Sequence, residues 1–317
     1  MTNKIIFNAT RVDQNNLVNC LKPSISAFYL NKELSLLNLV RKYSDSLGEK
    51  EMLFCTLETE KELIASCMLI GSNLNLNGLK LPIFFLTQVV TEEKFRRMGY
   101  FALLLQKVEA LTRQKKVDIL IVIARRAVTD LYWKFDFKGF AHFPEYNLKS
   151  TVELPSINSF RTANLEDLEM LRDVHSRSIN NSNCKIIRSK LFWQSIIKNQ
   201  SEVTCEVLIP IDKQNKNYVI LQNGALVEAS SGGDHQNSNN FFVETESLLK
   251  PIKLDRFHPI SSCLLSDKWQ YKERFEPKEG HLYKLLGTLP KVTKIFFEEI
   301  TKEFGNERLE ISALDQW

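Results

Sequence analysis

Pro82–Leu105, PIFFLTQVVTEEKFRRMGYFALLL, is the stretch that decides the fold of this chain. Its first part, Pro82–Val90, is almost continuously apolar and rich in β-branched and aromatic residues, which is typical of a central strand covered on both faces. Thr91–Lys94 is polar and interrupts the run. From Phe101 onward, apolar residues recur at helical spacing, which predicts a helix with one face packed on the sheet. The stretch therefore predicts a buried strand, a charged turn and a helix.

The turn between this strand and helix carries Arg96, Arg97 and Gly99. A helix N-terminus has unpaired backbone N–H groups and a partial positive charge, so it attracts phosphate. Gly99 would allow a ligand to approach the backbone closely, and the two arginines add charge and forked donors. The alternative is that Gly99 only eases the turn and the arginines face water. A single glycine after a strand does not separate these interpretations.

A second segment, VDILIVIARRAVTDLYWKFDFKGF at Val117–Phe140, has the same character. Val117–Ala124 predicts another buried strand, Leu131–Phe135 a short helix, and Phe137–Phe143 the next strand. Tyr132 lies in the short helix, beside other aromatic residues. In isolation it would be interpreted as a core or rim aromatic side chain.

Both segments resemble motifs of the GCN5-related N-acetyltransferase (GNAT) superfamily. That family carries Arg/Gln-x-x-Gly-x-Gly/Ala between a strand and a helix, and here Arg96 and Gly99 match while Phe101 replaces the small residue. The resemblance implies an α+β fold with a mixed, mainly antiparallel central sheet flanked by helices. It also implies acetyl-CoA as co-substrate, with its pantetheine arm on Val89, Val90 and Thr91 and its pyrophosphate on the segment Arg96, Arg97, Met98, Gly99, Tyr100, Phe101 and Ala102.

The second segment resembles the family pattern Tyr-x-Lys-Leu/Phe-Gly-Phe, with Asp136 in place of the glycine. The resemblance implies that Tyr132 protonates the departing thiolate of coenzyme A. Family members often use a carboxylate on the central strands as the base, for which Glu58 is the candidate; a solvated hairpin carboxylate is the alternative. Gln88 cannot act as a base, and an acceptor amine of low pKa would need none.

The implied function is transfer of an acyl group, expected to be acetyl, to the amine of an acceptor, expected to be a small molecule. The amine would attack the thioester directly. One alternative is a catalytically inactive protein that binds a ligand or partner, which the off-pattern residues Phe101 and Asp136 favour. Another is an enzyme that transfers a longer acyl group or acts on a hydroxyl. The sequence does not identify the acceptor or the oligomeric state.

The length of 317 residues allows two domains. We expect a GNAT domain over residues 1–150, a linker over 151–158 that contains Pro155, and a second, degenerate GNAT-like domain over 159–317. The second half restarts on Arg161-x-Ala-x-x-Glu-Asp-Leu168, which resembles the start of a GNAT domain, but it has no second phosphate motif. The chain would then be a tandem protein with one working half.

Composition excludes several other classes of protein. The net charge of +4 is dispersed, so nothing marks a nucleic-acid partner. The six cysteines form no Cys-x-x-Cys pair and the five histidines show no metal-ligand spacing, which favours reduced thiols and no metal. No signal peptide or membrane-spanning run is expected, so we predict a cytoplasmic protein.

Periodicity and turn residues predict the remaining elements. In the first half they are a strand at Ile5–Phe7, helices at Asn15–Leu21 and Leu34–Leu47, a hairpin of Met52–Thr59 with Leu63–Ile70, and a polar loop at Asn73–Lys80. In the second half they are helices after Leu165, at Lys190–Lys198 and at Ile295–Phe304, and strands at Val203–Pro210, Tyr218–Leu221, Ala225–Ser230, Phe241–Glu244, Cys263–Leu265 and His281–Leu286.

Overall fold

A computed structural model provides the fold. It describes residues 4–29, 31–44, 47, 50–76, 78–124, 128–139, 145–148, 160–181, 184–200, 205–212, 214, 216–222, 225–230, 269–272, 281–287, 289–291, 293–295 and 309–310. Several predicted segments lie outside these ranges: the linker 151–158, the strands Phe241–Glu244 and Cys263–Leu265, and most of the helix Ile295–Phe304. Within the described chain, no helix is long and apolar enough to span a membrane.

The larger of two main sheets is mixed and mainly antiparallel, as predicted. Its strands run in the order β1 (Ile6–Arg11), β2 (Met52–Glu58), β3 (Leu63–Leu76), β4 (Leu79–Thr91), β5 (Ile119–Ile123), β14 (His281–Leu285) and β6 (Lys138–Gly139). The central pair, β4 and β5, is parallel, and the other neighbours along this path are antiparallel. Two further strands, β9 (Cys184–Ile187) and β15 (Leu309–Glu310), extend from β3.

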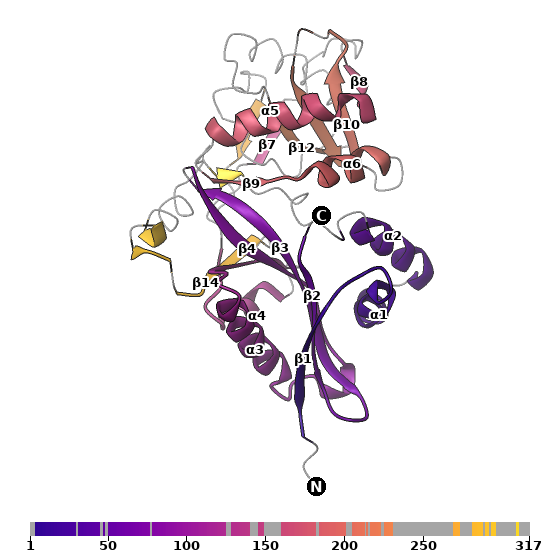
Figure 1. Ribbon diagram of the computed structural model, residues 1–317, viewed down its shortest axis with the longest axis vertical. Coiled ribbons are helices and arrows are strands. Elements are labelled where there is room, and N and C mark those ends of the chain that lie inside the picture. The colour runs from indigo at the N-terminus through magenta and orange to yellow at the C-terminus, as the bar shows by residue number, and fades with distance from the viewer. Residues whose placement is uncertain are drawn as a thin grey trace.

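Helices cover both faces of this sheet. On one side lie α1 (Leu17–Phe28) and α2 (Lys32–Ser44), and on the other lie α3 (Tyr100–Gln114) and α4 (Thr129–Trp133), as Figure 1 shows. Successive residues Phe84 and Phe85 of β4 are almost fully buried and belong to the two opposite cores. The apolar run of β4 is therefore explained, because both faces of the strand are covered.

The predicted polar loop at Asn73–Lys80 is wrong. Strands β3 and β4 continue through it and pair as far as Leu76 with Leu79. Leu74 and Leu76 are buried on one face, and residues Asn73–Leu76 also pair with β9. Strand pairing on both sides satisfies the polar backbone, so this segment does not need water in the way a loop does.

The first helix is longer than predicted. It was expected to end at Leu21, but α1 continues through Pro23 to Phe28. Proline inside a helix removes one backbone hydrogen bond. The apolar face of α1, which includes Leu17, Leu21 and Ile25, is buried in the core and offsets that loss.

Strand β14 comes from the C-terminal part of the chain but belongs to the first sheet. It pairs with β5 over five residues, from His281 with Ile123 to Leu285 with Ile119, and with β6 on its other edge. The predicted strand at His281–Leu286 is confirmed. Its partners show that this sheet contains residues from both sides of the expected linker.

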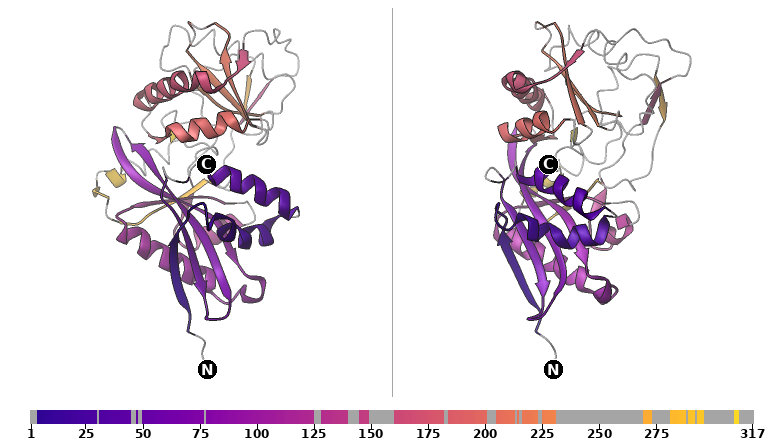
Figure 2. Two further views of the ribbon diagram at one scale, coloured as in Figure 1. Left: turned by 45° about the vertical axis from the view of Figure 1, so that its right-hand side comes forward. Right: turned by 90° about the vertical axis from the view of Figure 1, so that its right-hand side faces the viewer.

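A second, smaller sheet is entirely antiparallel. Its order is β12 (Ala225–Ser230), β11 (Tyr218–Gln222), β10 (Cys205–Pro210) and β8 (Phe160–Thr162). Helices α5 (Leu168–Asn181) and α6 (Lys190–Lys198) pack on one side of it, as Figure 2 shows, and share its core. A separate pair joins β7 (Glu145–Leu148) to β13 (Trp269–Lys272). The predicted helix Lys190–Lys198 and the three strands before Ser230 are confirmed.

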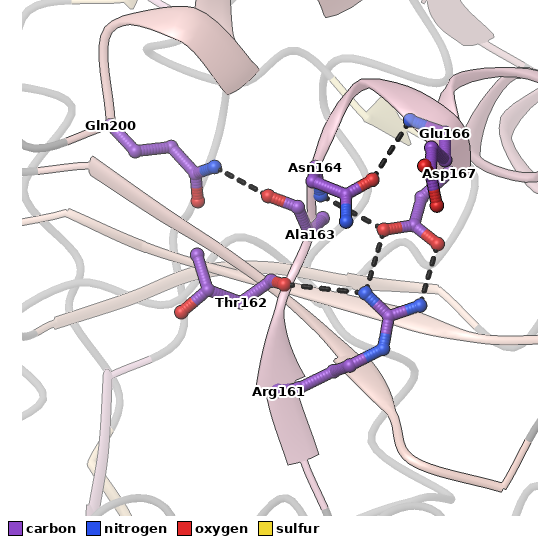
Figure 3. A network of polar contacts seen from close by, with 7 residues as sticks. All are labelled: Arg161, Thr162, Ala163, Asn164, Glu166, Asp167 and Gln200. Atoms are coloured by element: carbon purple, nitrogen blue, oxygen red, sulfur yellow. Dashed lines mark hydrogen bonds and ion pairs between the residues drawn. The ribbon is translucent and has the colours of Figure 1, made fainter.

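The Arg-x-Ala-x-x-Glu-Asp-Leu segment has a structural explanation (Figure 3). The Arg161 guanidinium donates two hydrogen bonds to the Asp167 carboxylate, at 2.8 and 2.7 Å. Asp167 also accepts from the backbone N–H of Asn164, whose side chain accepts from Glu166 N–H, so a capping box starts the helical segment. This motif fixes the start of α5 against β8.

Candidate active site

The two parallel strands at the centre of the first sheet separate before β4 ends. Pairing between β4 and β5 stops at Leu86 with Val122, whereas β4 continues to Thr91. Among the described residues, Thr87–Thr91 have no strand partner on the β5 side. This open backbone edge includes Val89, Val90 and Thr91, where an extended group could form main-chain hydrogen bonds as an added strand does.

The turn after β4 contains two left-handed residues, a pattern typical of a concave backbone. Arg97 and Gly99 both adopt left-handed conformations, with φ of 65° and 84°. Left-handed residues between ordinary ones turn successive N–H groups toward one point, which forms an anion-binding concavity. A Cβ atom built on Gly99 would meet nothing within 4 Å, so glycine is required there for its φ angle. The space beside its backbone is open.

Helix α3 begins directly at this turn. Its N-cap, Gly99, provides no side-chain cap, and the first turn carries no acidic residue. The first N–H groups of a helix have no partner within it, so those of Tyr100, Phe101 and Ala102 can bind an anion. Arg96 and Arg97 are exposed beside them, and Met98, between Arg97 and Gly99, is 61% exposed. The Arg96 Nε atom donates to the Thr91 carbonyl at 3.2 Å, which ties the turn to the end of β4.

The off-pattern Phe101 packs inward. Its ring meets Phe135 edge to face, with centroids 5.3 Å apart, and it also contacts Tyr132. The aromatic ring therefore supports α4 from the first turn of α3. Asp136, the other departure from the family pattern, has a φ of 61°. The position requires a left-handed backbone, which glycine adopts freely and aspartate tolerates better than most residues.

Tyr132 lies on α4 in the core beneath α3. Its side chain is 5% exposed, and burial followed by the nearby Cys67 raises the pKa of the phenol. No described residue forms a hydrogen bond with its hydroxyl. A phenol of raised pKa holds its proton at neutral pH, so Tyr132 can donate a proton to a group that gains negative charge.

Glu58 lies at the end of β2, and its carboxylate accepts a hydrogen bond from the side chain of Asn8 on β1. Strand β3 lies between it and β4. Its role as a base stays a prediction.

The sequence did not identify Tyr43 as a site residue. The Tyr43 hydroxyl accepts a hydrogen bond from Gln88 Nε2 at 3.3 Å. Tyr43 belongs to the apolar stripe of the helix predicted at Leu34–Leu47, but helical spacing carries no information about a partner 45 residues away.

No cluster of metal-ligating side chains occurs in the described part of the chain. His175 is buried, with its ring nitrogens near Tyr218 Oη and the Ile186 carbonyl, at 3.3 and 3.2 Å. It is therefore a core histidine with both nitrogens in hydrogen-bonding contact.

Comparison with solved structures agrees with this arrangement. A GCN5-related N-acetyltransferase from Kribbella flavida is similar over 89% of this chain and 71% of its own, with a TM-score of 0.63 and 14% identity. A second GCN5-related N-acetyltransferase, from Anabaena variabilis, is similar over 89% of this chain and 73% of its own, with a TM-score of 0.59 and 12% identity. Eis1 from Mycobacterium abscessus is similar over 89% of this chain and 74% of its own, with a TM-score of 0.57 and 13% identity. No protein-family model and no curated protein sequence matches the chain.

At these identities the likeness shows the fold. The chain has the fold of the GCN5-related N-acetyltransferases, as the two sequence motifs predicted. The α+β class and the mixed, mainly antiparallel sheet are likewise confirmed.

Proposed function

We propose that the chain is an acyl-CoA-dependent N-acyltransferase that moves an acetyl group from acetyl-CoA to an amine. The observation that carries the proposal is the combination of three features: the open edge of β4, the left-handed turn at Gly99 and the buried phenol of Tyr132. The fold shared with N-acetyltransferases supports the same assignment.

In this proposal each part of the site has one task. The backbone of Val89–Thr91 holds the pantetheine arm, and the N–H groups at the start of α3 hold the pyrophosphate with the two arginines beside them. Acetyl-CoA supplies the activated acyl thioester. The amine nitrogen bonds to the acyl carbon as the C–S bond breaks, the amine loses one proton to water or to Glu58 as the predicted base, and Tyr132 protonates the leaving thiolate. Holding the amine and the thioester together accounts for much of the rate.

Calorimetric titration with acetyl-CoA tests the cofactor. We expect micromolar binding by the full chain, about −8 kcal/mol. Gly99→Glu should abolish it, because the substitution strains a φ of 84° and places negative charge in the open space. The matched control is Gly78→Glu, another exposed glycine of similar φ that lies at the β3–β4 turn, far along β4 from the left-handed turn. The Gly78→Glu variant carries the same backbone strain and should bind acetyl-CoA normally.

The outcome separates the candidate functions. Binding followed by release of coenzyme A with a panel of amines supports the transferase, and a scan of acyl-chain lengths then tests the preference for acetyl. Binding without turnover on any amine or alcohol favours an inactive ligand-binding protein. Absence of binding by the folded wild-type chain would reject the proposal.

A further inference from the structure

Strand β4 contains a bulge at the point where it leaves β5. Thr87 pairs with Met68 and Val90 pairs with Ser66, so two residues, Gln88 and Val89, face the single residue Cys67. Gln88 has a φ of 52°. A left-handed conformation is unfavourable for a non-glycine residue, and such strain persists only where the surroundings hold it. The bulge redirects the side chain of Gln88.

The redirected side chain meets Tyr43 on α2. Gln88 Nε2 donates to the Tyr43 hydroxyl at 3.3 Å, and Tyr43 is 1% exposed among the apolar residues beneath α1 and α2. Thr87 and Tyr29 also lie close to this hydroxyl, and burial raises the pKa of the phenol. These four residues, Tyr29, Tyr43, Thr87 and Gln88, form the Gln88 cluster, which by residue type contains no acidic or basic side chain. Thr87 and Gln88 are half-buried, so a ligand can reach them.

This cluster and Tyr132 lie on opposite faces of the sheet. Tyr43 belongs to the core beneath α1 and α2, whereas Tyr132 belongs to the core beneath α3 and α4. The strand separation after Leu86 lies between them. A thioester held at the open edge of β4 would therefore have the proton donor for its sulfur on one face and the Gln88 cluster on the other. An amine that approaches from the second face reaches the acyl carbon without passing Tyr132.

We propose that Gln88, positioned by Tyr43, binds the acceptor nitrogen and selects weakly basic primary amines on an aromatic or aliphatic body. The inference rests on the proposed acyltransferase function. Gln88 offers an amide oxygen to an N–H group, and none of the four described side chains of the cluster is a carboxylate that could balance an ammonium ion. Burying an unpaired positive charge is costly, so a polycationic acceptor is disfavoured. A neutral amine also needs no strong base before it attacks.

Three amines with acetyl-CoA test the selection. para-Toluidine is weakly basic, 2-phenylethylamine has a similar body but is strongly basic, and spermidine is a polycation. For the wild-type chain we expect kcat/KM to fall from para-toluidine through 2-phenylethylamine to spermidine, with about tenfold or more between the first and the last. Gln88→Glu should reverse the order by adding a carboxylate. Tyr43→Phe should raise the KM for each amine and leave the KM for acetyl-CoA unchanged. Gln106→Glu, on the exposed face of α3, is the control for added charge.

Calorimetry of the same amines in the presence of saturating coenzyme A gives a readout that does not depend on turnover. The inference is overturned if spermidine binds as tightly as para-toluidine, if para-toluidine does not bind, or if both Gln88→Glu and Tyr43→Phe behave as wild type. These results leave acetyl-CoA binding intact, so they differ from failure of the proposed function, in which acetyl-CoA itself does not bind and this inference fails with it.

Discussion

The rings of Phe101 and Tyr132 meet edge to face, with centroids 5.5 Å apart and planes at 83°. Phe101 lies in the first turn of α3, whose N–H groups form the candidate phosphate site, and Tyr132 is the candidate proton donor on α4. One aromatic contact thus links the two parts of the site. The position that departs from the family motif supports the residue that the chemistry would use.

Tyr132→Phe tests the proton donor. The substitution keeps the ring that contacts Phe101 and removes the hydroxyl, so acetyl-CoA affinity should stay near the wild-type value while kcat falls by about 10²-fold. Trp133→Phe, at the next position of α4, is the control and should retain most of the rate. Steady-state kinetics with calorimetry measures both quantities. Unchanged turnover in Tyr132→Phe would remove the residue from this role.

The pH profile gives an independent test of the same residue. Tyr132 must carry its proton to act as an acid, and burial and the neighbouring Cys67 raise its pKa. The acid form therefore persists to higher pH than for an ordinary tyrosine, whose pKa is about 10. The alkaline fall of kcat that depends on Tyr132 should lie above that value. A fall centred below it that disappears in Tyr132→Phe would contradict the assignment.

Strand β14 makes the first sheet depend on the C-terminal part of the chain. Leu282 is fully buried beneath α3, Lys284 forms an ion pair with Glu109 of α3 at 2.6 Å, and the Leu286 carbonyl accepts from Arg113 Nε at 2.9 Å. Leu282→Ala should lower the free energy of unfolding by about 2–5 kcal/mol. The loss of stability should appear in the unfolding transition that acetyl-CoA shifts.

Two measurements check this dependence. Urea unfolding followed with and without acetyl-CoA gives the loss of stability, and Ile295→Ala, at an exposed position, is the control expected to change it little. A fragment that ends at residue 158 lacks the strand between β5 and β6 and should not bind acetyl-CoA. If that fragment folds and binds normally, β14 is dispensable for the site.

The sequence was sufficient for the parts of the fold that depend on local pattern. The apolar run at Pro82–Val90 and the helical spacing after Gly99 predicted β4 and α3 because a strand buried on both faces and an amphipathic helix each have their own signature. The turn between them was predicted because polar residues interrupt the apolar run. The left-handed residues Arg97 and Gly99 agree with its interpretation as an anion-binding turn.

Features that depend on distant partners were not predictable. β14 was expected as a strand, but pairing with β5 joins residues about 160 positions apart, and periodicity does not encode the partner. The polar residues of Asn73–Lys80 suggested a loop because their pairing with β9 was not visible in the sequence. The contact between Gln88 and Tyr43 depends on a bulge, and none of the local signals used for the sequence indicated one.

Asp136→Gly should stabilise the protein. Asp136 follows α4 with a φ of 61°, a conformation that costs an L-residue more than glycine. Relief of this strain exceeds the extra chain entropy that glycine gives the unfolded state, so we expect a gain of roughly 0.5–1 kcal/mol. Thermal unfolding measures it. Asp136→Ala is the matched comparison and should lose stability. If Asp136→Gly also loses stability, the Asp136 carboxylate contributes more to stability than the backbone strain costs.

The lowered pKa of Lys42 predicts how the free energy of unfolding depends on pH. Burial, with a smaller effect of Lys50, lowers the pKa of Lys42 to about 8, below the value of about 10.4 in an unfolded chain. Between these values the unfolded chain binds the proton and the folded chain does not, so stability rises with pH across this window. The two pKa values set an upper limit of about 3 kcal/mol, and solvent screening of the partly exposed side chain reduces the expected rise to the order of 1 kcal/mol. Unfolding in urea from pH 7.5 to 10.5 should show it in wild type and in the exposed-site control Lys32→Met, and not in Lys42→Met. An equal rise in all three proteins would show that Lys42 is not its source.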